Sequence, residues 1–287
     1  MIAWGEALIK EIAARRCLIF LGAGASMGCV SAVDGVSPPS WPELLRRLAS
    51  RISELDTKDF VGNLIDAKKY LDAAEIIKSR IDPADFTDTM RAIFEAPRFE
   101  KSSIHESILR IDPKVVITTN FDRIYDNYCL EGQAVAGYNV CKYHEDHLVS
   151  DLRSPIRSIV KAHGCVSVPD RMVLTRSDFF KAKARHPSFF QVLDALFLTH
   201  TILFIGYSME DPDIQLTLEN ASIAAPSAHR HHFICSDDDH QALKDSKSKS
   251  FNLTLHEFPS GDYAHLEQSV SDLADRVISA REEQPQL

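Results

Sequence analysis

Four short motifs place glycines and polar side chains directly after apolar runs of the sequence, where they could hold a ligand. The first is Gly22-Ala23-Gly24-Ala-Ser26, which follows the run Cys17–Leu21. Glycines at such a point let a phosphate approach the backbone, and a following helix would direct free N–H groups at it. The glycine spacing differs from the usual dinucleotide fingerprint. A tight turn without a ligand is therefore the alternative interpretation.

The second motif, Thr118-Thr-Asn120-Phe-Asp122, stands at the end of the run Val115–Thr118. Polar residues at the carboxyl end of a parallel strand face the crevice in which α/β proteins bind ligands. Asn120 can both donate and accept hydrogen bonds. Asp122 suits either a ligand contact or the N-cap of a helix that begins near Arg123.

The third motif, Lys161-Ala-His163-Gly164, ends another apolar run. Histidine is the side chain best suited to general acid–base chemistry near neutral pH, which makes His163 a candidate base. The fourth motif begins at Gly206, which would permit close approach of a ligand, and includes Ser208, whose hydroxyl suits phosphate or ribose. Asp211 precedes a proline and is expected to cap a helix.

A metal site is not expected. The six cysteines contain no C-x-x-C pair, which argues against a zinc ribbon. The cluster His229-Arg-His-His232 matches no ligand spacing and is interpreted as a solvated strand start. Cys17 and Cys235 lie in apolar runs and indicate buried thiols in a reducing compartment, the cytoplasm.

Short apolar runs alternate with helical patterns, which predicts parallel strands joined by crossover helices. The expected fold class is α/β, with a Rossmann-like, doubly wound, mainly parallel sheet. The predicted strands are Cys17–Leu21, Val115–Thr118, Ser158–Lys161, Ile202–Ile205, His232–Cys235 and Leu253–Phe258.

Residues 40–110 show only amphipathic helical patterns and predict a helical insert after the first strand. Residues 263–281 predict a final amphipathic helix, and Lys244–Ser250 a surface loop. The expected organisation is one domain over residues 1–287.

Composition excludes several classes of protein. Of 287 residues, 41 are acidic and 32 basic, a net charge of −9, so a surface for direct nucleic-acid binding is not expected. The longest apolar runs fall far short of the roughly 20 residues of a membrane helix. The N-terminal residues show no secretory signal.

Taken in order, the four motifs resemble the sirtuin family, and most closely the bacterial sirtuin-like domains that lack a zinc module. The resemblance runs from about Cys17 to Asp213 and implies a fold that binds NAD and breaks its nicotinamide–ribose bond. It implies that Gly22, Ala23, Gly24 and Ser26 line the pyrophosphate and ribose, and that Gly206 and Ser208 contact the adenosine half. Asn120 and Asp122 would face the nicotinamide ribose and carboxamide, Asn120 and His163 would be catalytic, and Trp41 would serve packing.

The cysteine pairs that bind zinc in sirtuin deacetylases are not found after Gly164, where only Cys165 follows. The resemblance therefore implies an NAD hydrolase of the anti-phage defence type, with NAD as substrate and no metal. Such relatives form homo-oligomers and often act with a HerA-like DNA-translocating ATPase.

Three alternatives remain. A module that only senses NAD or ADP-ribose has no evident use for a base at the ribose. An NAD-dependent deacylase would need other supports in place of the zinc module. A Rossmann dehydrogenase is disfavoured by the glycine spacing and by the missing acidic residue after a second strand.

Overall fold

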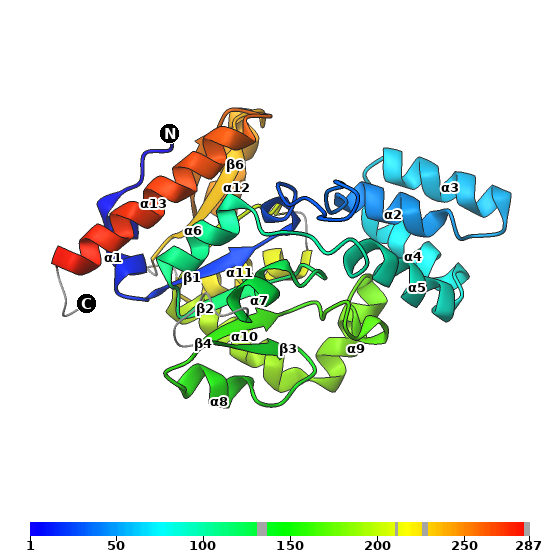
Figure 1. Ribbon diagram of the computed structural model, residues 1–287, viewed down its shortest axis with the longest axis horizontal. Helices are drawn as coiled ribbons and strands as arrows, with labels where there is room; N and C mark the ends of the chain where they lie inside the picture. Colours follow the sequence, from blue (N-terminus) through cyan, green and yellow to red (C-terminus); the bar gives the residue numbers. More distant parts are fainter. Residues whose placement is uncertain (131–136, 210–211, 226–228, 284–287) are drawn as a thin grey trace.

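The computed structural model describes residues 1–130, 137–209, 212–225 and 229–283, and within them seven strands form one sheet (Figure 1). The strands are β1 (Cys17–Leu21), β2 (Val115–Thr118), β3 (Tyr138–Lys142), β4 (Arg157–Lys161), β5 (Thr201–Ile205), β6 (His231–Ser236) and β7 (Leu253–Phe258). Their order is β3-β4-β2-β1-β5-β6-β7, and every neighbouring pair is parallel. The predicted α/β class with a Rossmann-like parallel sheet is confirmed.

Helices cover both faces of this sheet. One face packs against α1 (Glu6–Ala13), α6 (Ser103–Ile111), α7 (Ile124–Tyr128) and α13 (Tyr263–Glu283). The other packs against α8 (Leu148–Arg153), α9 (Arg176–Arg185), α10 (Pro187–Thr199) and α11 (Pro212–Ala224). Alternate residues of β1 point to opposite faces, since Ile19 lies in the first core and Phe20 in the second. A sheet with helices on both faces requires strands that are apolar on both sides.

Between β1 and β2 the chain forms α2 (Trp41–Ala49), α3 (Leu55–Asp66), α4 (Tyr70–Arg80) and α5 (Pro83–Phe94) before it reaches α6. In Figure 1 these four helices lie together beyond one end of the sheet. They enclose a third hydrophobic cluster, against which Trp41 packs as expected. Phe121, Cys165 and Val166 also belong to this cluster. The helices therefore rest on the loops that follow β2 and β4.

Two local predictions were wrong, and one strand was missed. Lys244–Ser250 is not a loop but part of α12 (Gln241–Ser250), which packs beside β7 and buries the Lys244 side chain. His231 was expected at a solvated strand start but is buried, 5% exposed, between neighbouring strands. The edge strand β3 was not predicted at all.

A membrane-spanning helix is not found in the described part of the chain: every helix there is too short or too polar to cross a bilayer.

Candidate functional site

The loops that follow β1 and β5 meet at the carboxyl edge of the sheet. Chain order reverses there, because β2 lies on one side of β1 and β5 on the other, and α/β proteins bind ligands at such a switch point. Gly24 donates its N–H to the Gly206 carbonyl over 2.8 Å, and Gly22 donates to the Ile205 carbonyl over 3.0 Å. The two loops therefore pack backbone against backbone.

Glycine is required on both sides of this contact. Gly206 has a φ of +65°, and a Cβ added there would overlap the backbone nitrogen of Ala25. A Cβ on Gly22 would likewise overlap the Gly206 carbonyl. The sequence suggested that these glycines make room for a phosphate. In this structure the space that a Cβ would take is occupied by the facing loop.

The glycine loop turns through a short 3₁₀ segment, Ala23–Ala25, and brings Ser26 inward. The Ser26 side chain is buried, 2% exposed, and its Oγ donates to Asp122 Oδ2 over 3.0 Å. The second carboxylate oxygen, Oδ1, accepts the N–H of Ile124 over 3.1 Å. Asp122 thus secures the start of α7, as its predicted capping role requires, although the N-cap position itself is Arg123.

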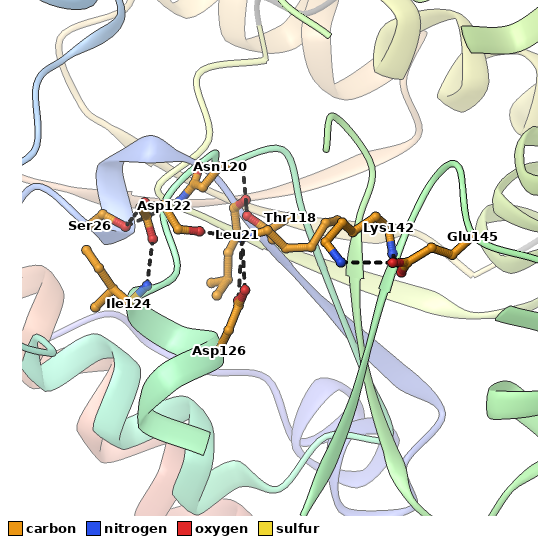
Figure 2. A network of polar contacts seen from close by, with 10 residues as sticks. Leu21, Ser26, Thr118, Asn120, Asp122, Ile124, Asp126, Lys142 and Glu145 are labelled. Carbon is orange, nitrogen blue, oxygen red and sulfur yellow. Dashed lines mark hydrogen bonds and ion pairs between the residues drawn. The ribbon is translucent and has the colours of Figure 1, made fainter. Parts of the chain in front are cut away.

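Asn120 joins the same network (Figure 2). Its carboxamide donates to the Gly22 carbonyl over 3.0 Å and to Ser26 Oγ over 3.3 Å. Thr118, which sequence reasoning gave no role, accepts the Asn120 N–H over 3.0 Å and donates to the Leu21 carbonyl over 2.9 Å. Hydrogen bonds therefore fix the ends of β1 and β2 relative to each other.

Beneath this network lies a buried ion pair that sequence reasoning missed. Lys161 is 1% exposed, and its Nζ lies 3.4 Å from the carboxylate of Asp126 and donates to the Asp122 carbonyl. Burial by itself would lower the pKa of Lys161, but the neighbouring anionic groups, Asp126 foremost, raise it overall. The charged lysine thus connects β4 to the loop that carries Asp122. The lysine at a strand end was the available sequence signal, since such a residue is rarely buried without a partner.

A second missed pair supports the glycine loop from behind. Ser102 donates its hydroxyl to the Ala25 carbonyl over 3.2 Å, and the two residues Ser102 and His105 form the N-terminal cap of α6. Burial lowers the pKa of His105 to about 4, so the imidazole is neutral at physiological pH. The sequence signal was a serine three residues before a residue able to complete a capping box.

His163 lies two residues beyond β4 and lines a small pocket. The pocket walls come from α9, α10 and α11 and include Phe179, Phe190 and Ile214, with Lys183 and Asp194 beside them. Among the described residues that line it, none belongs to the glycine loop, and Asn120 is not one of them. An imidazole here meets apolar walls with one cationic and one anionic side chain.

The loops that carry Asn120 and His163 are nevertheless neighbours in the backbone. Strands β2 and β4 are paired in register, Thr118 opposite Lys161. The Ala162 N–H then donates to the Thr118 carbonyl over 2.9 Å.

The predicted residues fall into two groups in the structure. Around the glycine loop, hydrogen bonds connect Gly22, Ser26, Asn120 and Asp122 into one network, and a separate hydrogen bond joins Gly24 to Gly206. Ala23 and Ser208 are exposed at the same two loops, and His163 lines its own pocket. Asp211, predicted as a cap, lies outside the described residues.

Comparisons with known proteins agree with this fold and these motifs. The SIR2-like domain family matches residues 114–256. The chain is 25% identical to the NAD(+) hydrolase ThsA of Bacillus cereus (strain MSX-D12) over 224 residues, 78% of this chain and 44% of the relative. It is 25% identical to defense-associated sirtuin 2 of Bacillus subtilis over 287 residues, 96% of this chain and 27% of that protein. The NAD(+) hydrolase ThsA of Acinetobacter baumannii (strain 532279) is 24% identical over 263 residues, 91% of this chain and 51% of the relative.

A parallel sheet with a polar network at its switch point defines an α/β protein of the ligand-binding, doubly wound class. More narrowly, the chain contains a SIR2-like domain at residues 114–256, as its motifs indicated. It spans about a quarter to a half of the length of these curated relatives.

Proposed function

We propose that this protein hydrolyses NAD to nicotinamide and ADP-ribose. The observation that carries the proposal is the network in which Asn120, Ser26 and Asp122 converge on the glycine loop at the switch point of the sheet. The relatives named NAD(+) hydrolase support the choice of substrate and reaction. The SIR2-like match covers residues 114–256 of this chain, which include both candidate catalytic residues.

Cleavage of the nicotinamide–ribose bond develops positive charge on the ribose as nicotinamide leaves. In our proposal water attacks the ribose carbon from which nicotinamide leaves. Asn120 holds the water or the ribose hydroxyls, and His163 accepts the proton that is released. General-base assistance of this kind contributes roughly 10²–10⁴-fold to a rate. Positioning of the reactants adds to that.

The remaining site residues are assigned to binding. Ala23 and Ser208 are exposed and can be reached by the pyrophosphate and adenosine parts of NAD, beside Gly22, Gly24 and Gly206. Ser26 and Asp122 already bond to each other. We infer that NAD binding exchanges part of this network, first of all the bond from Asn120 to the Gly22 carbonyl, for contacts to the nicotinamide ribose.

We further infer that residues 1–287 act as one NAD-binding domain with the helical insert at about residues 40–110. The insert supports a role in control, because its hydrophobic cluster includes Phe121, Cys165 and Val166 from the two candidate loops. A homo-oligomer, or a HerA-like ATPase bound to the insert, would be able to adjust both loops at once. The name of the Bacillus subtilis relative supports a role in anti-phage defence. Six free cysteines support a cytoplasmic location.

The test is to incubate the purified protein with NAD, with and without an acetylated peptide, and to resolve the products by chromatography. The proposal predicts nicotinamide and ADP-ribose in equal amounts without peptide. Consumption only in the presence of peptide would indicate a deacylase. Binding of NAD without consumption, at every protein concentration tested, would indicate a sensing module.

A further inference from the structure

The loop between β3 and α8 gathers three side chains of the kinds that bind transition metals. Cys141 is buried near the end of β3, Glu145 lies in the loop, and His147 is exposed just before α8. One ligand atom from each lies within 4.8 Å of the others. Ligand atoms around a tetrahedral zinc ion, with bonds of about 2.0–2.3 Å, are separated by somewhat less. Movements on the order of 1 Å in this loop would complete the set.

The imidazole of His147 is already oriented for such a site. Its Nδ1 lies 2.6 Å from Asp151 Oδ2, while its Nε2 is directed to Glu145 Oε2 at 3.5 Å. The other oxygen of Asp151 accepts a hydrogen bond from Asn139 on β3 over 3.3 Å. A carboxylate that holds one imidazole nitrogen, so that the other faces the metal, is the usual outer support of a histidine ligand.

The local charges also favour a divalent cation. Glu145 and Asp151 are acidic, and Lys142 compensates one of them, since its Nζ lies 2.9 Å from Glu145 Oε1 (Figure 2). With Asp146, which follows Glu145 along the chain, three carboxylates and one lysine lie near the cluster.

We propose that Cys141, Glu145 and His147 bind a zinc ion, with water as the fourth ligand. A thiolate and an imidazole select zinc over calcium or magnesium, which prefer oxygen ligands alone. No metal was expected from the sequence, because its cysteines form no C-x-x-C pair and its histidine cluster matches no ligand spacing. The ligands proposed here follow a different pattern, C-x₃-E-x-H.

Zinc would have a structural role here and would stabilise the edge of the sheet. It would connect edge strand β3 to the start of α8. The same loop donates a hydrogen bond from the Tyr143 N–H to the Lys161 carbonyl over 3.2 Å, so β4 is held by the loop as well. This role is independent of NAD cleavage, and its test does not depend on activity.

The experiment is zinc titration of the chelator-treated protein against a chromophoric chelator, together with cobalt substitution. Cobalt bound by a thiolate gives a charge-transfer band that cobalt bound by oxygen and nitrogen alone does not give. We expect one zinc per chain and a cobalt–thiolate band. Cys141→Ser and His147→Ala should abolish both, and His147, being exposed, can be replaced without disturbing the core. Asp151→Asn should weaken binding roughly 10–100-fold.

The matched controls are Cys235→Ser, which removes a partly buried thiol elsewhere, and His229→Ala, which removes an exposed histidine. Both should bind zinc as the wild-type protein does. Circular dichroism confirms that each variant is folded. Absence of stoichiometric zinc in the wild-type protein, or zinc binding that survives both Cys141→Ser and His147→Ala, would overturn the proposal and leave an ordinary cluster of ion pairs.

Discussion

The backbone N–H of Val166 donates a hydrogen bond to the carbonyl of Phe121 over 2.9 Å. Phe121 stands between Asn120 and Asp122, and Val166 follows His163 by three residues. The rings of Phe121 and Phe94 of α5 are also in edge contact, with centroids 6.3 Å apart. The two candidate catalytic loops and the helical insert therefore form one packed unit, so a movement of the insert would be transmitted to both loops.

The close contact between the glycine loops predicts a strong effect of Gly206→Ala. The added methyl group would overlap Ala25. In addition, a φ of +65° costs an alanine residue roughly 1–2 kcal/mol of conformational free energy. We expect the free energy of unfolding, measured with urea, to fall by more than that amount.

Gly62→Ala is the matched control, since Gly62 lies within α3 and a Cβ there meets nothing within 4 Å. This change should stabilise the protein by about 0.5–1 kcal/mol. Equal effects of the two substitutions would show that the loops are not packed as described.

The hydroxyl of Ser26 predicts a coupled loss of stability. In Ser26→Ala, Asp122 loses a donor and Asn120 loses an acceptor, both in buried or half-buried surroundings. An unsatisfied buried polar group costs about 1–3 kcal/mol. A double-mutant cycle with Asn120→Ala, followed by urea unfolding, should give a coupling energy clearly above zero. Additive effects would mean that the network contributes nothing as a unit.

The buried Lys161–Asp126 pair predicts that its two partners depend on each other. Lys161→Met leaves the carboxylate of Asp126 buried without its cation, at a cost of about 3–5 kcal/mol. Adding Asp126→Leu removes the stranded charge and should restore part of the stability. Urea unfolding of the single and double variants provides the comparison. A double variant less stable than Lys161→Met would contradict this pairing.

Three histidines near one end of the sheet predict acid sensitivity. Burial lowers the pKa values of His231, His232 and His256 to about 4, and the His256 cation would further oppose protonation of His232. The unfolded chain binds these protons near pH 6.5. The stability from the neutral rings is therefore fully present above about pH 6.5 and is lost as the pH falls toward 4.

Urea unfolding at a series of pH values tests this directly. Each such histidine should contribute a slope of up to about 1.4 kcal/mol per pH unit between those limits. His256→Phe keeps a ring beside Trp4 and should reduce the slope. His229→Ala, at an exposed position, should leave it unchanged. A slope that does not respond to His256→Phe would assign the acid sensitivity to other groups.

Much of the fold could be predicted because continuous apolar runs such as Cys17–Leu21 are characteristic of strands covered on both faces. The edge strand β3 was not predicted because its residues, Tyr138–Lys142, mix polar and apolar types. Among the described residues, no strand pairs with it on one side. The helix α12 was not predicted because its sequence is polar and Lys244 is its only buried residue. The Lys244 amine donates hydrogen bonds to Glu257 and to the Asp237 carbonyl.

For the candidate site, residue types and spacing predicted which loops form it but not the hydrogen-bond partners of their side chains. Asn120 and Ser26 were chosen for a ligand, and both already hold other parts of the chain in place. Lys161 and Thr118 were passed over, since their partners come from other strands and depend on sheet register. Such contacts follow from tertiary structure and leave no local pattern in the sequence.

Nicotinamide release from NAD by the wild-type protein and by Asn120→Ala tests the central claim most directly. Asn127→Ala, at an exposed asparagine of α7, and His229→Ala serve as controls for Asn120→Ala and His163→Ala. We predict that Asn120→Ala and His163→Ala each remain folded and lose at least roughly 100-fold in turnover, which is the size of general-base and positioning effects. Both control variants should keep wild-type rates. Near-wild-type release of nicotinamide by folded Asn120→Ala protein would contradict the proposed site.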